Sequence, residues 1–141
     1  MQHPLPVVIG GTGPRRTPAL AARFAAEYNV PFARLNRIAA CFDRVRRACE
    51  ESGRDPASLL LSAAQTLAIG RDEAEVTRRA AYVGSSAADS RSGGLGGTVS
   101  EVVDKLGRLG ELGASRIYLQ LMDLDDLDQL RLVASEVVPR I

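Results

Sequence analysis

The residues best suited to chemistry lie near the N-terminus, where residues 7–17 read VVIGGTGPRRT. Glycines let backbone N–H groups approach an anion closely, and a helix that begins nearby adds a partial positive charge. Arginine side chains can form paired hydrogen bonds with phosphate oxygens. The segment therefore predicts a phosphate-binding loop, made of Gly10, Gly11, Thr12, Gly13, Arg15 and Arg16. The alternative is a tight turn, in which the glycines only supply unusual backbone angles and the arginines are solvated.

A dinucleotide-binding loop is a further possibility for this segment, and it requires the pattern G-x-G-x-x-G. Gly11 and Gly13 begin that pattern, but Arg16 occupies the position of the third glycine. An acidic residue that binds the ribose is also expected about 20 residues later, at the end of a second strand. Glu27 comes too early for this role, and Asp43 lies inside a predicted helix. We therefore rank a small NAD(P)-binding open-sheet protein third among the functional hypotheses.

Side chains that bind metals are sparse in this sequence. His3 is the one histidine, and the two cysteines, Cys41 and Cys49, are eight residues apart on a predicted helix. That spacing is about two helical turns, which is too far for a disulfide between them. Four aspartates near the C-terminus are interrupted by leucines and lack the glycine of an EF-hand loop: Asp123, Asp125, Asp126 and Asp128. We predict that they cap a helix, and we predict no metal site.

Composition and charge narrow the class of protein. The 141 residues are 45% hydrophobic and 25% charged, as in ordinary globular domains. The net charge is +1, so no long-range field attracts nucleic acid or an anionic membrane. No stretch approaches the roughly 20 uncharged apolar residues that a membrane span requires. We predict one cytoplasmic domain, residues 1–141, that binds neither nucleic acid nor membrane.

Apolar patterning predicts four units, each a strand followed by a helix. The predicted strands are Leu5–Ile9, Glu27–Val30, Leu59–Ile69 and Arg116–Leu121. The helices follow start signals, among them Thr17 as a cap before Pro18, and the capping pairs Asp72 with Glu75 and Thr98 with Glu101. Further helices are predicted over 33–52 and from 127 onward. The segment 85–97 is rich in glycine and serine, which predicts a mobile loop.

Strands that alternate with helices predict an α/β fold with a parallel sheet and right-handed crossovers. Both an open doubly wound sheet and part of a barrel satisfy this pattern. In either architecture the ligand-binding loops leave the carboxyl ends of the strands, which is where the glycine loop lies. Ser62, Gln65 and Thr66 on the third strand either face a binding pocket or form hydrogen bonds within the sheet. We assign these three residues no role in a mechanism.

Several segments are similar to one family of enzymes. Residues 6–29 read PVVIGGTGPRRTPALAARFAAEYN, and three later segments continue the similarity: ESGRDP, GGTVSEVVDKL and RIYLQLMDLDDL. Together they resemble luciferase-like oxidoreductases, especially those that use the deazaflavin coenzyme F-420. This sequence has Tyr28 where the family commonly has tryptophan, but it keeps the pair of an aromatic residue and asparagine at Tyr28 and Asn29.

The resemblance implies a fold and a set of cofactor contacts. Family members are eight-stranded β/α barrels, and this chain resembles their C-terminal half, strands five to eight, without the first four β/α units. It implies that the loop Gly10–Arg16 contacts the phosphate of coenzyme F-420 or, as the alternative, of FMN. Asn29 is a further candidate for cofactor binding, and Arg91 lies where another phosphate contact is expected. The catalytic residues stay unknown, because the family holds the deazaflavin ring and substrate largely with its N-terminal half.

The resemblance implies an oxidoreductase that transfers hydride with the cofactor, with this chain supplying the phosphate-binding half. The second hypothesis is a non-catalytic subunit or remnant that binds an anionic cofactor or pairs with a complementary half-barrel partner. Half a barrel leaves two strand edges unpaired and exposes the face that would line the barrel. We therefore expect a homo-oligomer or a complex with a complementary half barrel.

Overall fold

The computed structural model describes residues 5–141, and His3 lies outside the described residues. The strands are β1 (Val8–Gly10), β2 (Glu27–Pro31), β3 (Leu60–Gly70), β4 (Leu95–Thr98) and β5 (Arg116–Gln120). The α-helices are α1 (Arg16–Phe24), α2 (Leu35–Glu51), α3 (Glu73–Tyr82), α4 (Ala87–Gly93), α5 (Val99–Glu111) and α6 (Leu127–Leu132). Short 3-10 turns cover Pro56–Ser58 and Val138–Arg140, and a π turn covers Val133–Val137. The predicted α/β fold with four strand-then-helix units is confirmed, with β4 as an additional strand.

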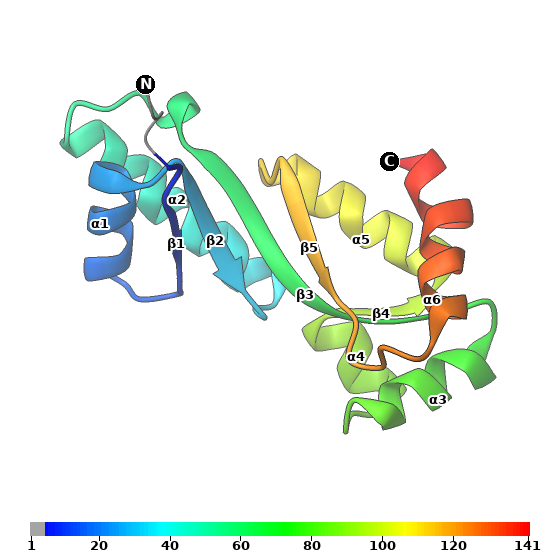
Figure 1. The fold of residues 1–141 in the computed structure, drawn as a ribbon. Helices are drawn as coiled ribbons and strands as arrows, with labels where there is room; N and C mark the ends of the chain where they lie inside the picture. The colour runs from blue at the N-terminus through cyan, green and yellow to red at the C-terminus, as the bar shows by residue number, and fades with distance from the viewer. Residues whose placement is uncertain (1–4) are drawn as a thin grey trace. The chain divides into compact units, whose positions relative to one another are not determined.

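The chain forms two compact units (Figure 1). The first unit holds residues 1–64 and 112–118, and the second holds residues 65–111 and 119–141. Two strands, β3 and β5, contribute residues to both units. Within the described residues, no helix is long and apolar enough to cross a membrane.

The first unit is built on parallel strands in the order β1, β2, β3, with β5 on the far side of β3. Val8 pairs with Glu27, and Glu27 pairs with Leu60, which sets the register of the three strands. The Ser115 amide donates to the Leu61 carbonyl at 2.9 Å, which brings β5 alongside β3. In this unit β1 and β5 are therefore the edge strands.

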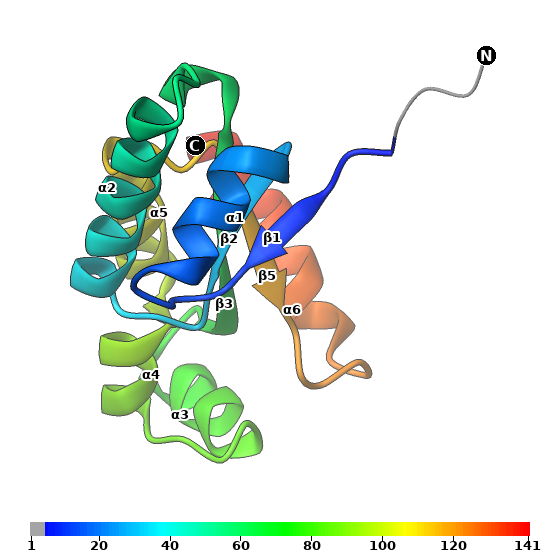
Figure 2. The ribbon, with the colours of Figure 1, turned by 90° about the vertical axis from the view of Figure 1, so that its left-hand side faces the viewer.

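Two helices cover the first unit, and they lie beside each other next to β1 and β2 (Figures 1 and 2). Apolar side chains of α2 and β2 are buried together: Tyr28, Val30, Ile38, Phe42, Val45 and Cys49. α2 ends before Gly53, whose φ of +73° suits glycine. Arg54 then donates to the carbonyls of Ala21, Ala22 and Ala25 at the end of α1. A cation in this position satisfies carbonyls that a helix terminus leaves without partners.

The start of α1 differs from the prediction. The helix begins at Arg16, with Arg15 as the capping residue and no side-chain cap, so Thr17 lies inside the first turn. The Thr17 side chain instead packs against the glycine loop: a Cβ atom on Gly13 would lie 2.6 Å from its Oγ1. Thr17 therefore contacts the loop rather than capping the helix.

The second unit pairs the last part of β3 in parallel with β4, from Leu67 opposite Leu95 to Gly70 opposite Thr98. The prediction of a mobile loop over 85–97 is wrong, because this segment forms α4 and β4. Ser86 caps α4 by accepting a hydrogen bond from the Asp89 amide at 3.0 Å. The glycines allow close packing here, since a Cβ atom on Gly96 would lie 2.5 Å from Cβ of Ser90.

Both predicted capping pairs form in the second unit. The Asp72 carboxylate accepts from the Glu75 amide at 2.9 Å, at the start of α3. Glu101 Oε2 accepts from the Thr98 amide at 2.7 Å, at the start of α5. These contacts satisfy N–H groups that the first helical turn leaves free.

A buried ion pair joins α3 to the start of α6. Arg79 and Asp126 are both almost fully buried, and Arg79 Nε donates to Asp126 Oδ2 at 2.7 Å. Asp126 also caps α6 by accepting from the Gln129 amide, as the helix-capping hypothesis for these aspartates predicts. The hydrogen bond from Arg79 and the charge beside it lower the pKa of the Asp126 carboxyl to about 2. The folded second unit therefore favours the ionised carboxylate.

We predict that Asp126→Asn lowers the free energy of unfolding by about 2 kcal/mol at pH 7. This figure is the lowering of the Asp126 pKa converted to free energy. Asparagine keeps the cap but removes the charge. The carboxyl binds a proton more weakly in the folded chain, so its contribution is complete above about pH 5 and is lost as the pH falls toward 2. Denaturant unfolding from pH 7 to pH 3 measures this difference. The control is Asp125→Asn, because among the described residues the exposed Asp125 carboxylate forms no ion pair. A loss that does not shrink at low pH would contradict the prediction.

Candidate functional site

The predicted phosphate-binding loop leaves the carboxyl end of β1 and leads into α1. Gly10 pairs with Asn29 of β2, and the Gly11 amide donates to the Asn29 carbonyl at 3.0 Å. Gly11 has a φ of +137°, which residues with a side chain rarely adopt. The chain therefore turns away from the sheet directly after its last ladder hydrogen bond.

Side chains from β2 and α2 hold two carbonyl groups of this loop. The Tyr28 hydroxyl donates to the Gly11 carbonyl at 2.8 Å, and Arg37 Nη2 donates to the Thr12 carbonyl at 3.1 Å. Burial, reinforced by the neighbouring Cys41, raises the pKa of the Tyr28 phenol above its ordinary value. The hydroxyl therefore stays protonated and remains a donor across the physiological pH range.

The start of α1 offers positive charge without a competing anion. Its first turn has no side-chain cap and no acidic residue. Arg15 and Arg16 are exposed, and neither forms an ion pair with any residue that the structure describes. An uncapped helix start beside two unpaired guanidinium groups favours an anion.

Asn29 lies next to the loop on β2 and reaches across to β3. Its Nδ2 donates to Ser62 Oγ at 2.9 Å, and the buried Ser62 hydroxyl also contacts the Tyr28 carbonyl at 3.4 Å. Ser62 therefore forms its hydrogen bonds inside the sheet. In the second unit, Thr66 Oγ1 donates to Gln120 of β5 at 3.3 Å.

Arg91 lies in α4, in the second unit, and its guanidinium group is held by two carboxylates. Nη2 lies 2.6 Å from Glu73 of α3, and Nε lies 2.9 Å from Glu101 of α5. The hydrogen bond from Arg91 lowers the pKa of the Glu101 carboxyl to about 2. A phosphate at Arg91 would have to displace one of these partners, and its predicted role in phosphate binding stays a prediction.

Sequence patterns did not single out several residues that shape the first unit. Glu27, which is 4% exposed, binds both Arg116 and Tyr118 of β5. Tyr28 and Arg37 hold the glycine loop from other elements. For Tyr28 the one available signal was its place directly before Asn29, and no pattern in the sequence connects Arg37 with the loop.

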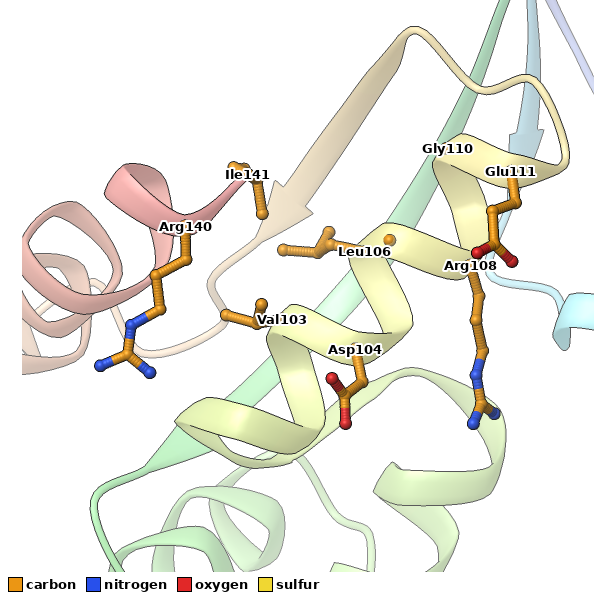
Figure 3. Close-up of a pocket in the computed structure, with 9 residues that line it drawn as sticks. Val103, Asp104, Leu106, Arg108, Gly110, Glu111, Arg140 and Ile141 are labelled. Carbon is orange, nitrogen blue, oxygen red and sulfur yellow. The ribbon is translucent and has the colours of Figure 1, made fainter.

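Two open hollows lie in the second unit. One, of about 640 Å³, lies between α5 and the C-terminal residues, where Val103, Leu106 and Ile141 lie near Asp104 and Arg140 (Figure 3). The other, of about 300 Å³, is lined by residues that include Thr66, Asp89, Ser90 and Gln120. No predicted site residue lines either hollow. Across residues 5–141, no group of three or more His, Cys, Asp or Glu is placed to hold a metal ion.

Comparison with protein families identifies the chain. Residues 1–130 match the family model described as luciferase-like monooxygenase. The chain belongs to the luciferase-like monooxygenase family. The resemblance seen in the sequence is thereby confirmed. A search of the curated protein sequences found no match.

Solved structures of luciferase-like enzymes share the fold at low sequence identity. The coenzyme F-420-dependent tetrahydromethanopterin reductase from Methanopyrus kandleri is 18% identical, with a TM-score of 0.74 over 96% of this chain and 50% of that one. An F-420-dependent secondary alcohol dehydrogenase in complex with an F-420–acetone adduct is 16% identical, with a TM-score of 0.78 over 98% of this chain and 49% of that one.

A flavin enzyme is similar to the same extent. The oxygenating constituent of 3,6-diketocamphane monooxygenase from Pseudomonas putida, in complex with FMN, is 18% identical, with a TM-score of 0.71 over 96% of this chain and 49% of that one. The luciferase-like chain therefore spans about half the length of these structures.

The contact between Gly13 and Thr17 gives a test of the loop conformation. We predict that Gly13→Ala lowers the free energy of unfolding by about 1 to 3 kcal/mol, because the added methyl group meets Thr17 Oγ1. In a Thr17→Ala background the same change is expected to lower it by less than about 1 kcal/mol, because the clashing atom is gone. Denaturant unfolding of the four variants measures the coupling. Equal losses in both backgrounds would show that the loop lies away from Thr17.

Proposed function

We propose that this chain binds the phosphate-bearing part of coenzyme F-420, or alternatively of FMN, in an oxidoreductase of the luciferase-like family. The glycine loop carries the proposal, because it combines an uncapped helix start, two unpaired arginines and closely packed glycines at the carboxyl end of β1. The names of similar structures support the choice of cofactor, since they include F-420 and FMN enzymes.

The loop fits a phosphate group in charge. A Cβ atom on Gly13 would lie 2.6 Å from Thr17 Oγ1, and one on Gly11 would lie 3.4 Å from Thr17 Cγ2, so the loop lies against the first turn of α1. The exposed Arg15 and Arg16 can supply charge-assisted hydrogen bonds to phosphate oxygens. Asn29, beside the loop, is proposed as a polar contact to the part of the cofactor next to the phosphate, through the carbonyl oxygen of its side chain.

The cofactor itself would supply the hydride chemistry, while this chain would bind and orient it. The resemblance implies that the groups around the deazaflavin ring lie in the N-terminal half of the family barrel, so no residue of this chain is proposed as catalytic. We accordingly propose residues 1–141 as one luciferase-like domain that corresponds to the second half of that barrel.

A non-catalytic or complementing subunit is the second candidate function. It is favoured by the edge strands of the first unit. Val8 on β1 is 53% exposed, and Leu20 and Phe24 on α1 are 49% and 55% exposed. Such an apolar flank is expected to pack against another chain. A small NAD(P)-binding protein is a third candidate, and Arg16 at the third glycine position disfavours it.

We predict that the chain, or the assembly it forms, binds F-420 or FMN, and that replacing both Arg15 and Arg16 by glutamine weakens binding about tenfold or more. Fluorescence titration with each cofactor measures this, and a chromophore that copurifies would identify the cofactor by its absorbance. The matched control is Arg23→Gln, an exposed arginine in the last turn of the same helix. Absence of binding at high micromolar concentration of both cofactors would overturn the proposal. Affinity for NADP alone would favour the third candidate.

We predict that the chain sediments as a dimer or a larger species, because among the described residues of the first unit β1 and β5 each have one unpaired edge. Val8→Lys is expected to shift the species toward monomer, since a charge on an edge strand opposes pairing. Sedimentation velocity over a range of concentrations measures this. Ile141→Lys is the control, an exposed apolar residue outside any strand. A monomer at all concentrations, in the absence of a complementary half, would contradict self-association.

A further inference from the structure

The glycine loop contains both attractive and repulsive groups for a phosphate. Its amide N–H groups attract an anion, while its carbonyl oxygens carry partial negative charge and repel one. A loop of this length therefore binds phosphate only if the carbonyl groups are turned elsewhere. The hydrogen bonds of Gly11 and Thr12 show how this chain meets that requirement.

Tyr28 holds the first of these carbonyls. Its hydroxyl donates to the Gly11 oxygen at 2.8 Å, and the side chain is 1% exposed. A tyrosine buried to this extent requires a partner for its hydroxyl, and the Gly11 carbonyl provides it. The positive φ of Gly11 allows the peptide to turn toward Tyr28.

Arg37 holds the second carbonyl from a different element. Its Nη2 donates to the Thr12 oxygen at 3.1 Å, from an exposed position in the first turns of α2. The loop is thus anchored from β2 and from α2. The amides of Thr12, Gly13 and Arg15 find no acceptor among the residues that the structure describes, so these donors remain for a ligand.

We infer that Tyr28 and Arg37 are positioning residues, which hold the carbonyls of Gly11 and Thr12 toward β2 and α2 so that the loop presents its N–H groups to a phosphate. The inference rests on the proposed function and deepens it, because these two residues then set the preference for a phosphorylated cofactor over the same ring system without phosphate. A purely structural role for Tyr28 would instead change affinity for both forms equally, or change stability alone.

The test compares ligands that differ only in the phosphate. Kd is measured by fluorescence titration of the full chain for FMN and riboflavin, and for F-420 and the deazaflavin alcohol that remains when its phosphate-linked tail is removed. The readout is the ratio of the two Kd values in each pair, the phosphate preference. This ratio cancels any general loss of folded protein.

Tyr28→Phe removes only the hydroxyl, and we expect it to reduce the phosphate preference about fivefold, the range for one lost hydrogen bond. The affinity for the unphosphorylated ligands should stay within about twofold of that of the unmodified chain. Tyr118→Phe is the matched control, because its hydroxyl binds Glu27 in the same unit and does not touch the loop. It should leave the preference unchanged.

Arg37→Gln keeps the inference testable should Tyr28→Phe fail to fold, because Arg37 is exposed. We expect this variant to reduce the phosphate preference about threefold. If Arg37 acted on the phosphate directly through its charge, its effect would weaken in high salt. If it acts by holding the Thr12 carbonyl, salt should change its effect little. We therefore expect Arg37→Gln to lower the phosphate preference at 0.5 M NaCl as well, where the Debye length is about 4 Å.

The outcomes separate the two proposals. If the unmodified chain binds the phosphorylated and unphosphorylated ligands equally, or binds none of them, the proposed function fails and this inference fails with it. If the unmodified chain prefers the phosphorylated ligands but Tyr28→Phe and Arg37→Gln both keep the full preference, the inference is overturned and the proposed function stands.

Discussion

The parallel pairing of β1 with β2 is the constraint on which the candidate site depends. This register places Gly10 opposite Asn29 and ends with the hydrogen bond from the Gly11 amide to the Asn29 carbonyl. Because the ladder stops there, the next peptide groups are free to turn, and Tyr28, the neighbour of Asn29 on β2, can reach the Gly11 carbonyl. One strand register thus fixes where the loop begins and brings the Gly11 carbonyl within reach of Tyr28.

Hydrogen bonds from polar side chains, in addition to apolar packing, join the helices and strands within each unit. In the first unit Arg54 satisfies the last carbonyls of α1, and Glu27 binds Arg116 and Tyr118. In the second unit Lys105 Nζ donates to the carbonyls of Arg91 and Gly96 at 2.7 Å. Groups of this kind would be unfavourable if buried without partners. Their pairing makes each unit specific as well as stable.

The luciferase-like fold of this chain explains why binding and catalysis are separable questions here. The chain spans about half the length of similar solved structures, and its candidate phosphate-binding loop directly follows β1. A phosphate group anchors a cofactor through backbone amides and arginines, whereas hydride transfer needs groups around the ring. Phosphate binding and hydride transfer therefore depend on different groups, and the glycine loop bears only on the first of them.

The sequence alone determined the α/β class, the four strand-then-helix units and the place of the glycine loop, because apolar periodicity, capping pairs and glycines act over a few residues. It missed α4 and β4, because glycines such as Gly96 that permit close packing look the same in sequence as glycines that permit mobility. It could not show that Arg91 is paired with Glu73 and Glu101. Only the tertiary structure decided how the loop is oriented. The hydrogen bonds responsible join residues 17 and 25 positions apart, and contacts at that separation form only once strands and helices have packed.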